Sequence, residues 1–189
     1  MNNIVTTLKE ILAINSPTGY TIEVTDHIEK LFSGLDVIIT KTNKGSLLVS
    51  FVKDPELIVT GHIDTLGAMV KEIKDDGTNS FEGEYVTVRN FKGELFRGTF
   101  LLNNPASHVN KKLGETKRST ENMSIRLDEL VRSAEDVIKL GISVGDFVFY
   151  DTRFEYTKSG FVKSRFLDDK ACAAVMIELI KEYAASGSK

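Results

Sequence analysis

Cysteine, long apolar runs and an excess of positive charge are all missing from this sequence, and each absence excludes a class of protein. Cys172 is the only cysteine in 189 residues, so no disulfide can form within the chain, which indicates a reducing compartment. No apolar run approaches the roughly 20 residues that a membrane-spanning helix needs. Lysine and arginine number 24 against 27 aspartates and glutamates. A net charge of −3 gives no general field for binding nucleic acid or anionic lipid.

The start of the chain also lacks the basic and then apolar layout of a secretion signal, so we expect a cytoplasmic protein. Hydrophobic residues make up 41% and charged residues 27%, the balance of a soluble globular protein. The length suits one ordinary domain or two small ones.

Helix and strand patterns alternate at the beginning of the chain. Residues 3–14 place apolar side chains at helical spacing and predict an amphipathic helix. A second helix is predicted over about 21–32, capped by Thr21 or Thr18, with Ile22 on its buried side. Three strands are then predicted, at 37–39, 46–52 and 57–60. The last is short and apolar, as in a strand covered on both faces.

The middle of the chain is rich in predicted strands, which are joined by glycine-rich and aspartate-rich turns. Strands are predicted at 68–73, 85–91, 95–102 and 146–151, with a long loop at 103–124 and a helix at 133–140. A helical pattern returns from residue 164. The fold class is therefore α/β: one domain, residues 1–66 and 164–189, interrupted by a β-rich insertion, residues 67–163.

A histidine and an aspartate two residues apart follow the strand predicted at 57–60. The imidazole of His62 is a good ligand for Zn²⁺ or Co²⁺, and the carboxylate of Asp64 can orient that ring. In α/β sheets such side chains gather at the carboxyl ends of strands. The tripeptide is common, however, and taken alone it favours a structural histidine over a metal ligand.

Two adjacent carboxylates, Asp168 and Asp169, begin the last predicted helix. One carboxylate can bridge two metal ions, because each of its oxygens can bind one of them. Residues 171–174 are all small, which lets the backbone pack close to whatever the aspartates face. The alternative is an ordinary acidic helix start, which the helix dipole favours. Both motifs border the same predicted domain, on either side of the insertion, which favours a shared site.

Four segments resemble motifs of the tetrahedral (TET-type) two-metal aminopeptidases, whose members are named glutamyl or deblocking aminopeptidases and sometimes cellulases. Residues 14–19 are similar to the Pro-Ser-Gly turn of that family, and residues 60–70 resemble its Ala-His-Met-Asp-Glu-Ile-Gly-Phe-Met-Val signature. Residues 140–148 are similar to Leu-Gly-Val-x-x-Gly-Asp, and residues 166–171 to Ala-Leu-Asp-Asp-Arg-x-Gly. The two candidate ligands are 168 − 62 = 106 residues apart, which suits the PDZ-like insertion of this group.

The resemblance implies an aminopeptidase that releases amino-terminal residues from peptides. His62 would bind one of two divalent metal ions, Zn²⁺ or Co²⁺, Asp168 would bridge both, and Asp64 would steer His62. A water bridging the ions would attack the peptide carbonyl. The resemblance also implies a homo-oligomer assembled through the PDZ-like insertion.

The sequence departs from the family pattern in composition and in extent. Thr65 stands where the family usually has glutamate, and Cys172 where it often has glycine; neither is a ligand position. The family's Glu-Glu pair, a later aspartate and a final histidine would lie beyond Lys189. We therefore expect a truncated form without a general base, inactive or nearly so alone, since a catalytic zinc normally needs three protein ligands. An incomplete sheet would also expose apolar surface and an unpaired edge, which favours aggregation.

The remaining candidates have simpler explanations. His27 and His108 are expected at the surface, and Cys172 as a buried packing thiol. The basic pairs at 111–112 and 117–118 suit a solvated loop. Phenylalanines 81, 91, 96 and 100 suit the insertion core or an oligomer contact. Two other functions stay open: a non-catalytic peptide-binding or assembly module, and a carbohydrate hydrolase, for which no pair of acids is well placed.

Overall fold

The computed structural model describes residues 3–71, 82–106, 108–119 and 121–187. The chain divides into two compact units, residues 1–66 with 152–189 and residues 67–151. The first unit contains α1 (Asn3–Ala13), α2 (Ile22–Leu31), β1 (Ile38–Lys41), β2 (Leu47–Ser50), β8 (Glu155–Tyr156), β9 (Val162–Lys163) and α4 (Leu167–Ser186). The second contains β3 (Ala68–Met69), β4 (Glu84–Arg89), β5 (Leu95–Leu102), β6 (Met123–Leu127), α3 (Ala134–Lys139) and β7 (Phe147–Tyr150).

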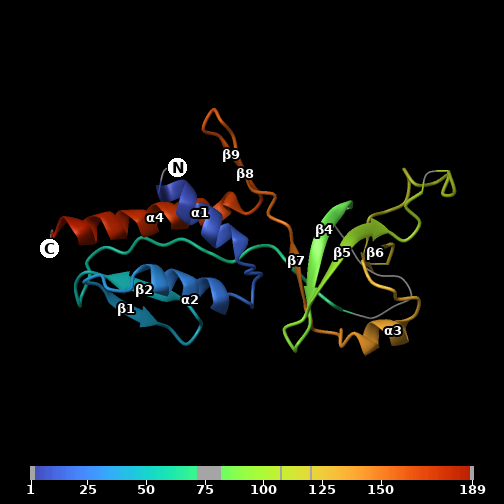
Figure 1. Cartoon of the computed structure of the whole chain (residues 1–189), viewed down its shortest axis with the longest axis horizontal. Coiled ribbons are helices and arrows are strands. Elements are labelled where there is room, and N and C mark those ends of the chain that lie inside the picture. Colours follow the sequence, from blue (N-terminus) through green and yellow to red (C-terminus); the bar gives the residue numbers. More distant parts are fainter. Residues whose placement is uncertain (1–2, 72–81, 107, 120, 188–189) are drawn as a thin grey trace. The chain divides into compact units, whose positions relative to one another are not determined.

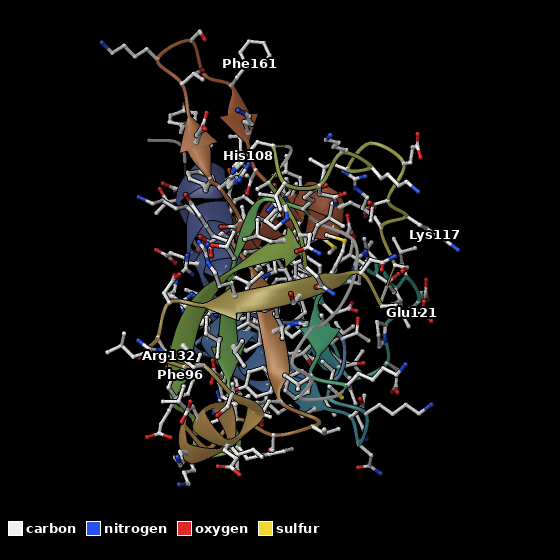
Figure 2. All side chains as sticks on the ribbon, turned by 90° about the vertical axis from the view of Figure 1, so that its right-hand side faces the viewer. Phe96, His108, Lys117, Glu121, Arg132 and Phe161 are labelled. Carbon is white, nitrogen blue, oxygen red and sulfur yellow. The ribbon has the colours of Figure 1, made fainter. Side chains whose placement is uncertain are left out.

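The first unit is a helical layer beside short antiparallel hairpins. α1 packs along α4, with α2 on the other side of α1, and the β1–β2 hairpin lies beside α2 (Figure 1). β1 and β2 pair antiparallel from Ile38 opposite Ser50 to Lys41 opposite Leu47. β8 and β9 form a second hairpin, whose turn carries the exposed Phe161 (Figure 2). The structure places residues 152–163 in this unit, whereas the sequence pattern groups them with the insertion.

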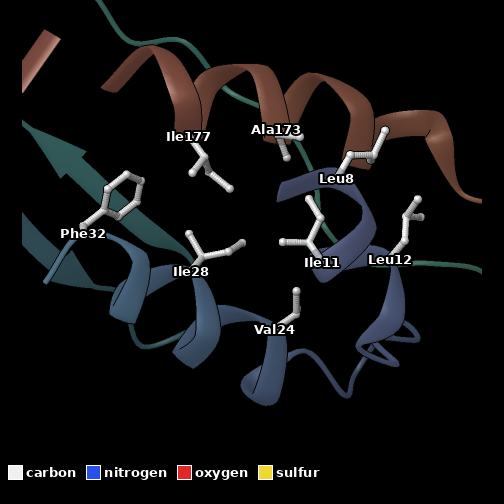
Figure 3. Packing of buried hydrophobic residues seen from close by; sticks show 9 residues of the cluster. Leu8, Ile11, Leu12, Val24, Ile28, Phe32, Ala173 and Ile177 are labelled. Atoms are coloured by element: carbon white, nitrogen blue, oxygen red, sulfur yellow. The ribbon is translucent and has the colours of Figure 1, made fainter. Parts of the chain in front are cut away.

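The core of the first unit is built by three helices whose apolar faces converge. Side chains of α1 lie between those of α2 and α4 (Figure 3). Its fully buried members are Leu8, Ile11, Leu12, Val24, Ile28, Phe32, Ala173, Ala174 and Ile177. The alanines of α4 have no side chain beyond Cβ, so α1 can approach this helix closely. Each large apolar side chain buried here contributes about 1.5–3 kcal/mol relative to an exposed one.

A polar contact also joins α1 to α4. The hydroxyl of the buried Thr7 donates to Oε1 of Glu178 at 2.6 Å, and Lys181 Nζ donates to the same oxygen at 2.7 Å. Partial desolvation acts to raise the pKa of Glu178, but the two hydrogen bonds outweigh it and the pKa is lowered. The charged carboxylate is therefore the form of Glu178 that the folded chain favours.

The second unit is a five-stranded antiparallel sheet with the order β3-β7-β4-β5-β6. Its buried face includes Val86 and Val88 of β4, Phe100 of β5 and Val148 of β7. Ser133 caps the amino-terminal end of α3, where its hydroxyl accepts a hydrogen bond from the backbone N–H of Asp136. Between β5 and β6, His108 and Lys117 are exposed (Figure 2).

The predicted helices at 3–14, 21–32 and 133–140 and the strand at 95–102 are confirmed. The strand predicted at 57–60 is wrong: these residues are not in a strand, and Leu57, Ile58 and Val59 are 80%, 67% and 71% exposed. A strand exists only where a neighbour accepts its backbone hydrogen bonds, and no ladder is described for this segment.

The burial predictions for Cys172 and Ile22 were also wrong. Cys172 is exposed rather than a buried packing thiol, because it lies on the side of α4 away from the core. Ile22 is exposed on α2, whereas His27 is only partly exposed and lies 3.6 Å from a carboxylate oxygen of Glu10. Of the four phenylalanines, Phe100 is core, Phe91 is exposed, and Phe81 lies outside the described residues. Within the described chain, no helix is both long and apolar enough to cross a membrane.

Candidate functional site

The segment that carries His62 and Asp64 lies along the turn between α1 and α2. The hydroxyl of the buried Ser16 donates to the carbonyl of Ile63 at 2.8 Å. The N–H of Thr65 donates to the carbonyl of Ser16 at 2.8 Å, and the N–H of Thr18 donates to the carbonyl of Thr65 at 3.2 Å. These bonds fix residues 63–65 although no regular strand passes through them.

Asp64 connects this turn to the imidazole of His62. The hydroxyl of Thr18 donates to Asp64 Oδ2 at 2.6 Å, while Asp64 Oδ1 lies 3.2 Å from His62 Nδ1. The carbonyl of Asp64 lies at the same distance of 3.2 Å from Nδ1. Both neighbours are acceptors, so they favour a proton on Nδ1 and leave the lone pair on Nε2, the tautomer of a histidine that binds metal through Nε2.

Asp168 approaches from the beginning of α4. Phe166 precedes it in the left-handed region with φ of 62°, and Asp168 and Asp169 have non-helical backbone angles. This irregular start turns the Asp168 side chain outward, where it is 97% exposed. Non-glycine residues adopt the left-handed conformation uncommonly, and such residues concentrate at functional sites.

The two sequence-predicted ligands are brought together by the fold. His62 Nε2 lies 3.4 Å from Asp168 Oδ1. Two donors at about 2.1 Å from one tetrahedral zinc ion are themselves about 3.4 Å apart, because the tetrahedral angle fixes that edge. The separation therefore suits two ligands of one ion as well as it suits a direct ion pair.

The charges around His62 favour its protonated form in the metal-free chain. Partial desolvation acts to lower the pKa of His62, but the hydrogen bonds and charges of Asp64 and Asp168 outweigh it, and the pKa is raised. A divalent ion would replace that proton between the same groups.

Gly61 is the residue that lets the two segments meet. A Cβ atom at this position would lie 2.8 Å from Asp169 Oδ2 and 2.6 Å from Met176 Cε. The carboxylate next to Asp168 thus packs against the backbone next to His62. Cys172 borders this contact, and its hydrogen bond to Asp169 raises the pKa of the thiol.

Lys170, two residues after Asp168, is fully buried at 1% exposure. Its ammonium donates to the carbonyl of Ile11 at 2.6 Å and to that of Ile14 at 3.0 Å. Burial lowers the pKa of Lys170 to about 8. The lysine therefore joins the start of α4 to the last turn of α1.

The donor set fits part of a metal centre. One imidazole nitrogen and one carboxylate oxygen converge, and these are donors that Zn²⁺ and Co²⁺ accept. Among the residues that the structure describes, no group of three or more histidine, cysteine, aspartate or glutamate side chains is placed to hold an ion. Two converging ligands are fewer than the three of a catalytic zinc.

Sequence reasoning missed the residues that support this pair. Thr18 was considered as a helix cap and as part of the turn at 14–19, but not as a partner of Asp64, which its hydroxyl binds. Thr21 precedes α2 without a side-chain cap. Lys170 did leave a signal, since it shares the helical spacing of the buried Ala173, Ala174 and Ile177. Thr18 lies in the family-like segment 14–19, but its contact with Asp64 could not be predicted from spacing, because the two residues are 46 apart in the chain.

The fold of this chain, in which a His-x-Asp segment meets an Asp-Asp helix start, is similar to that of solved TET aminopeptidases. The model of the M42 glutamyl aminopeptidase family matches residues 45–188, and the chain belongs to this family. It is 44% identical over 189 residues to YhfE of Bacillus subtilis (strain 168), which carries an aminopeptidase name, covering 93% of this chain and 55% of YhfE.

This chain also matches only about half the length of more distant relatives. FrvX of Escherichia coli (strain K12), also named as an aminopeptidase, is 28% identical over 81% of this chain and 43% of its own length. The TET aminopeptidase of Thaumarchaeota archaeon SCGC AB-539-E09 superposes with a TM-score of 0.84 at 20% identity, over 100% of this chain and 56% of the other. The TET1 peptidase of Pyrococcus horikoshii gives 0.77 at 20% identity, over 97% and 57%. This chain spans about half the length of the relatives it matches.

Proposed function

We propose that this chain forms part of a metal-dependent aminopeptidase that releases amino-terminal residues from peptides. The observation that carries the proposal is the convergence of His62 Nε2 and Asp168 Oδ1 at 3.4 Å, at a place where family membership leads us to expect metal ligands. The aminopeptidase names of YhfE and FrvX support the same reaction class.

In the proposed site His62 and Asp168 would hold divalent ions, with Asp168 shared between two of them. Bound Zn²⁺ or Co²⁺ would polarise the scissile carbonyl and lower the pKa of a water. Asp64 would keep the proton of His62 on Nδ1, and Thr18 would keep Asp64 in place. The described residues supply neither a third ligand nor a general base near this pair, so we infer that the chain alone is inactive or nearly so.

A zinc titration tests the metal site directly. Isothermal titration of the 189-residue chain with Zn²⁺ and Co²⁺ is expected to show weak, micromolar binding, because only two ligands converge. Asp168→Ala and His62→Ala should each abolish it. His108→Ala is the matched control: this histidine is exposed in the second unit and should leave binding unchanged. Equal binding by the wild-type chain and both site variants would overturn the assignment.

Complementation tests the reaction. The part of YhfE beyond the region matched here would be co-expressed with this chain, and release of a chromophore from amino-acid anilides measured. Activity that appears only with both parts and is lost in Asp168→Ala supports the aminopeptidase. A complex that forms and binds peptide, but gives no turnover with any added divalent ion, supports the alternative of a non-catalytic peptide-binding or assembly module. The absence of a three-ligand cluster among the described residues favours that second candidate.

We also propose that the second unit is the PDZ-like insertion and that it mediates self-association. One solved relative is described as a dodecamer and another as a tetrahedron or a large octahedral shell. In this chain Phe91 and Leu95, at the β4–β5 turn, are both exposed. Light scattering should show an oligomer that Phe91→Lys weakens; a wild-type monomer at all concentrations would refute this. A cytoplasmic location stays a prediction.

A further inference from the structure

The proposed mechanism leaves Lys170 unused, although this residue is unusual. A buried ammonium loses its hydration and is costly to place inside a protein unless its donors are satisfied. The partners described for Lys170 are not carboxylates but the backbone carbonyls of Ile11 and Ile14. These carbonyls lie at the carboxyl-terminal end of α1, where the helix dipole concentrates negative partial charge. The contact is a directional, two-point connection that an apolar side chain could not make.

Lys170 binds the end of α1 directly before the turn that supports the His62 segment. The turn that follows α1 also holds the other half of the candidate site, through Ser16 to Ile63 and through Thr18 to Asp64. Residues 11–18 therefore form a common frame. Ser16 and Thr18 bind the segment that follows His62, and the carbonyls of Ile11 and Ile14 bind Lys170.

We propose that Lys170 is a positioning residue: by its hydrogen bonds to the end of α1 it holds Asp168 opposite His62, and it thereby sets the affinity of the site for a divalent ion. This inference rests on the proposed function. The apolar packing of Ala173, Ala174 and Ile177 fixes α4 in the core, but these residues lie in regular helix beyond the irregular first turn. Asp168 itself is exposed and is not fixed by core packing.

Three variants of the full 189-residue chain separate positioning from stability. Lys170→Met keeps the length of the side chain and removes its donors, and we expect at least a tenfold weaker affinity for Zn²⁺ by calorimetry, the usual loss when a supporting partner of a ligand is removed. Lys170→Arg keeps donors for both carbonyls and should restore affinity to within about threefold of wild type. Lys181→Met is the matched control, since Lys181 is on the same helix but pairs with Glu178; it should leave zinc affinity unchanged.

A metal-free readout comes from the imidazole of His62. The chain has three histidines, so the side-chain ¹⁵N resonances of His62 can be assigned by their loss in His62→Ala. In metal-free Lys170→Met these resonances should shift, because Asp168 no longer faces Nε2, whereas in Lys181→Met they should not. Circular dichroism establishes that each variant is folded. If Lys170→Met is unfolded, Lys170→Gln is used in its place. Glutamine is shorter but keeps an N–H donor for one of the two carbonyls, so we expect a smaller loss of zinc affinity than for Lys170→Met.

The outcomes distinguish the two proposals. If the wild-type chain binds no Zn²⁺ but the His62 resonances shift in Lys170→Met, the metal proposal fails and the positioning of Asp168 by Lys170 stands. If folded Lys170→Met or Lys170→Gln has unchanged His62 resonances and binds Zn²⁺ as tightly as wild type, Lys170 is only structural and the inference is overturned.

Discussion

Gly61→Ala is the smallest change that should damage the candidate site. The added methyl would lie 2.8 Å from Asp169 Oδ2 and 2.6 Å from Met176 Cε. Met176 can yield, because Cε is the end of a flexible side chain. The Asp169 carboxylate must retreat by 3.4 − 2.8 = 0.6 Å before ordinary van der Waals contact is restored. Gly61 does not have a positive φ, so alanine meets no backbone strain and the effect comes from this contact.

The expected losses of stability and of zinc affinity follow from how closely the side chains pack and how little metal–ligand distances vary. Overpacking a close contact costs about 1–3 kcal/mol, and the melting temperature should fall by roughly 2–4 °C for each kcal/mol in a chain of this size. Ligand positions tolerate displacements of only about 0.2 Å. A shift of 0.6 Å beside Asp168 should therefore weaken zinc binding about tenfold or more.

Calorimetric titration with Zn²⁺ and a thermal melt of the metal-free chain measure the two effects. Gly114→Ala is the matched control, because a Cβ at Gly114 meets nothing within 4 Å; it should change neither quantity. A Gly61→Ala chain with the melting temperature and zinc affinity of wild type would show that the Asp169 carboxylate is not held against residue 61, and the described meeting of the two segments would be wrong.

Three further changes test the fold around the site. Ile11→Ala should lower the free energy of unfolding by about 2–5 kcal/mol in a denaturant titration, whereas Ile38→Ala, at a 47% exposed position, should cost under about 1.5 kcal/mol. Thr7→Val removes a hydrogen bond to a carboxylate and should cost about 1.5–3 kcal/mol at neutral pH. Because the pKa of Glu178 is lowered in the folded chain, this stabilisation should be present above its ordinary pKa and be lost as the pH falls through the folded value; a pH-independent difference would refute the assignment. Ile58→Lys should reduce binding of the dye ANS and slow aggregation, and an unchanged dye signal would exclude segment 57–59 as the exposed apolar surface.

Local patterns in the sequence were enough to predict the helices of the first unit. The spacing of Leu8, Ile11 and Leu12 predicts the buried face of α1, and all three are buried. This works because helix hydrogen bonds close within four residues. The segment at 57–60 has an equally clear apolar pattern but no strand, since a strand depends on a neighbour that the sequence pattern does not identify.

The candidate site was predictable only in part, for the same physical reason. His62, Asp64 and Asp168 stand out by residue type and by their motifs. Their supporting contacts depend on distances in space: Thr18 binds Asp64 across 46 residues, and Lys170 reaches Ile11 across 159. A hydroxyl in a turn and a lysine in a helix have too many possible partners for the sequence to select one.

The arrangement of these contacts argues that the geometry of the candidate site does not depend on the exposed segment 57–59. The neighbours of the two candidate ligands are bound to residues 11–18: Ile63 and Asp64 to the turn after α1, and Lys170 to the carbonyls of Ile11 and Ile14. None of those bonds involves the exposed segment 57–59, and α1 itself is fixed by the apolar core of the first unit. Loss of order at 57–59 would therefore leave the frame of the site intact, and metal binding by the two ligands should survive conditions that remove residual structure from that segment.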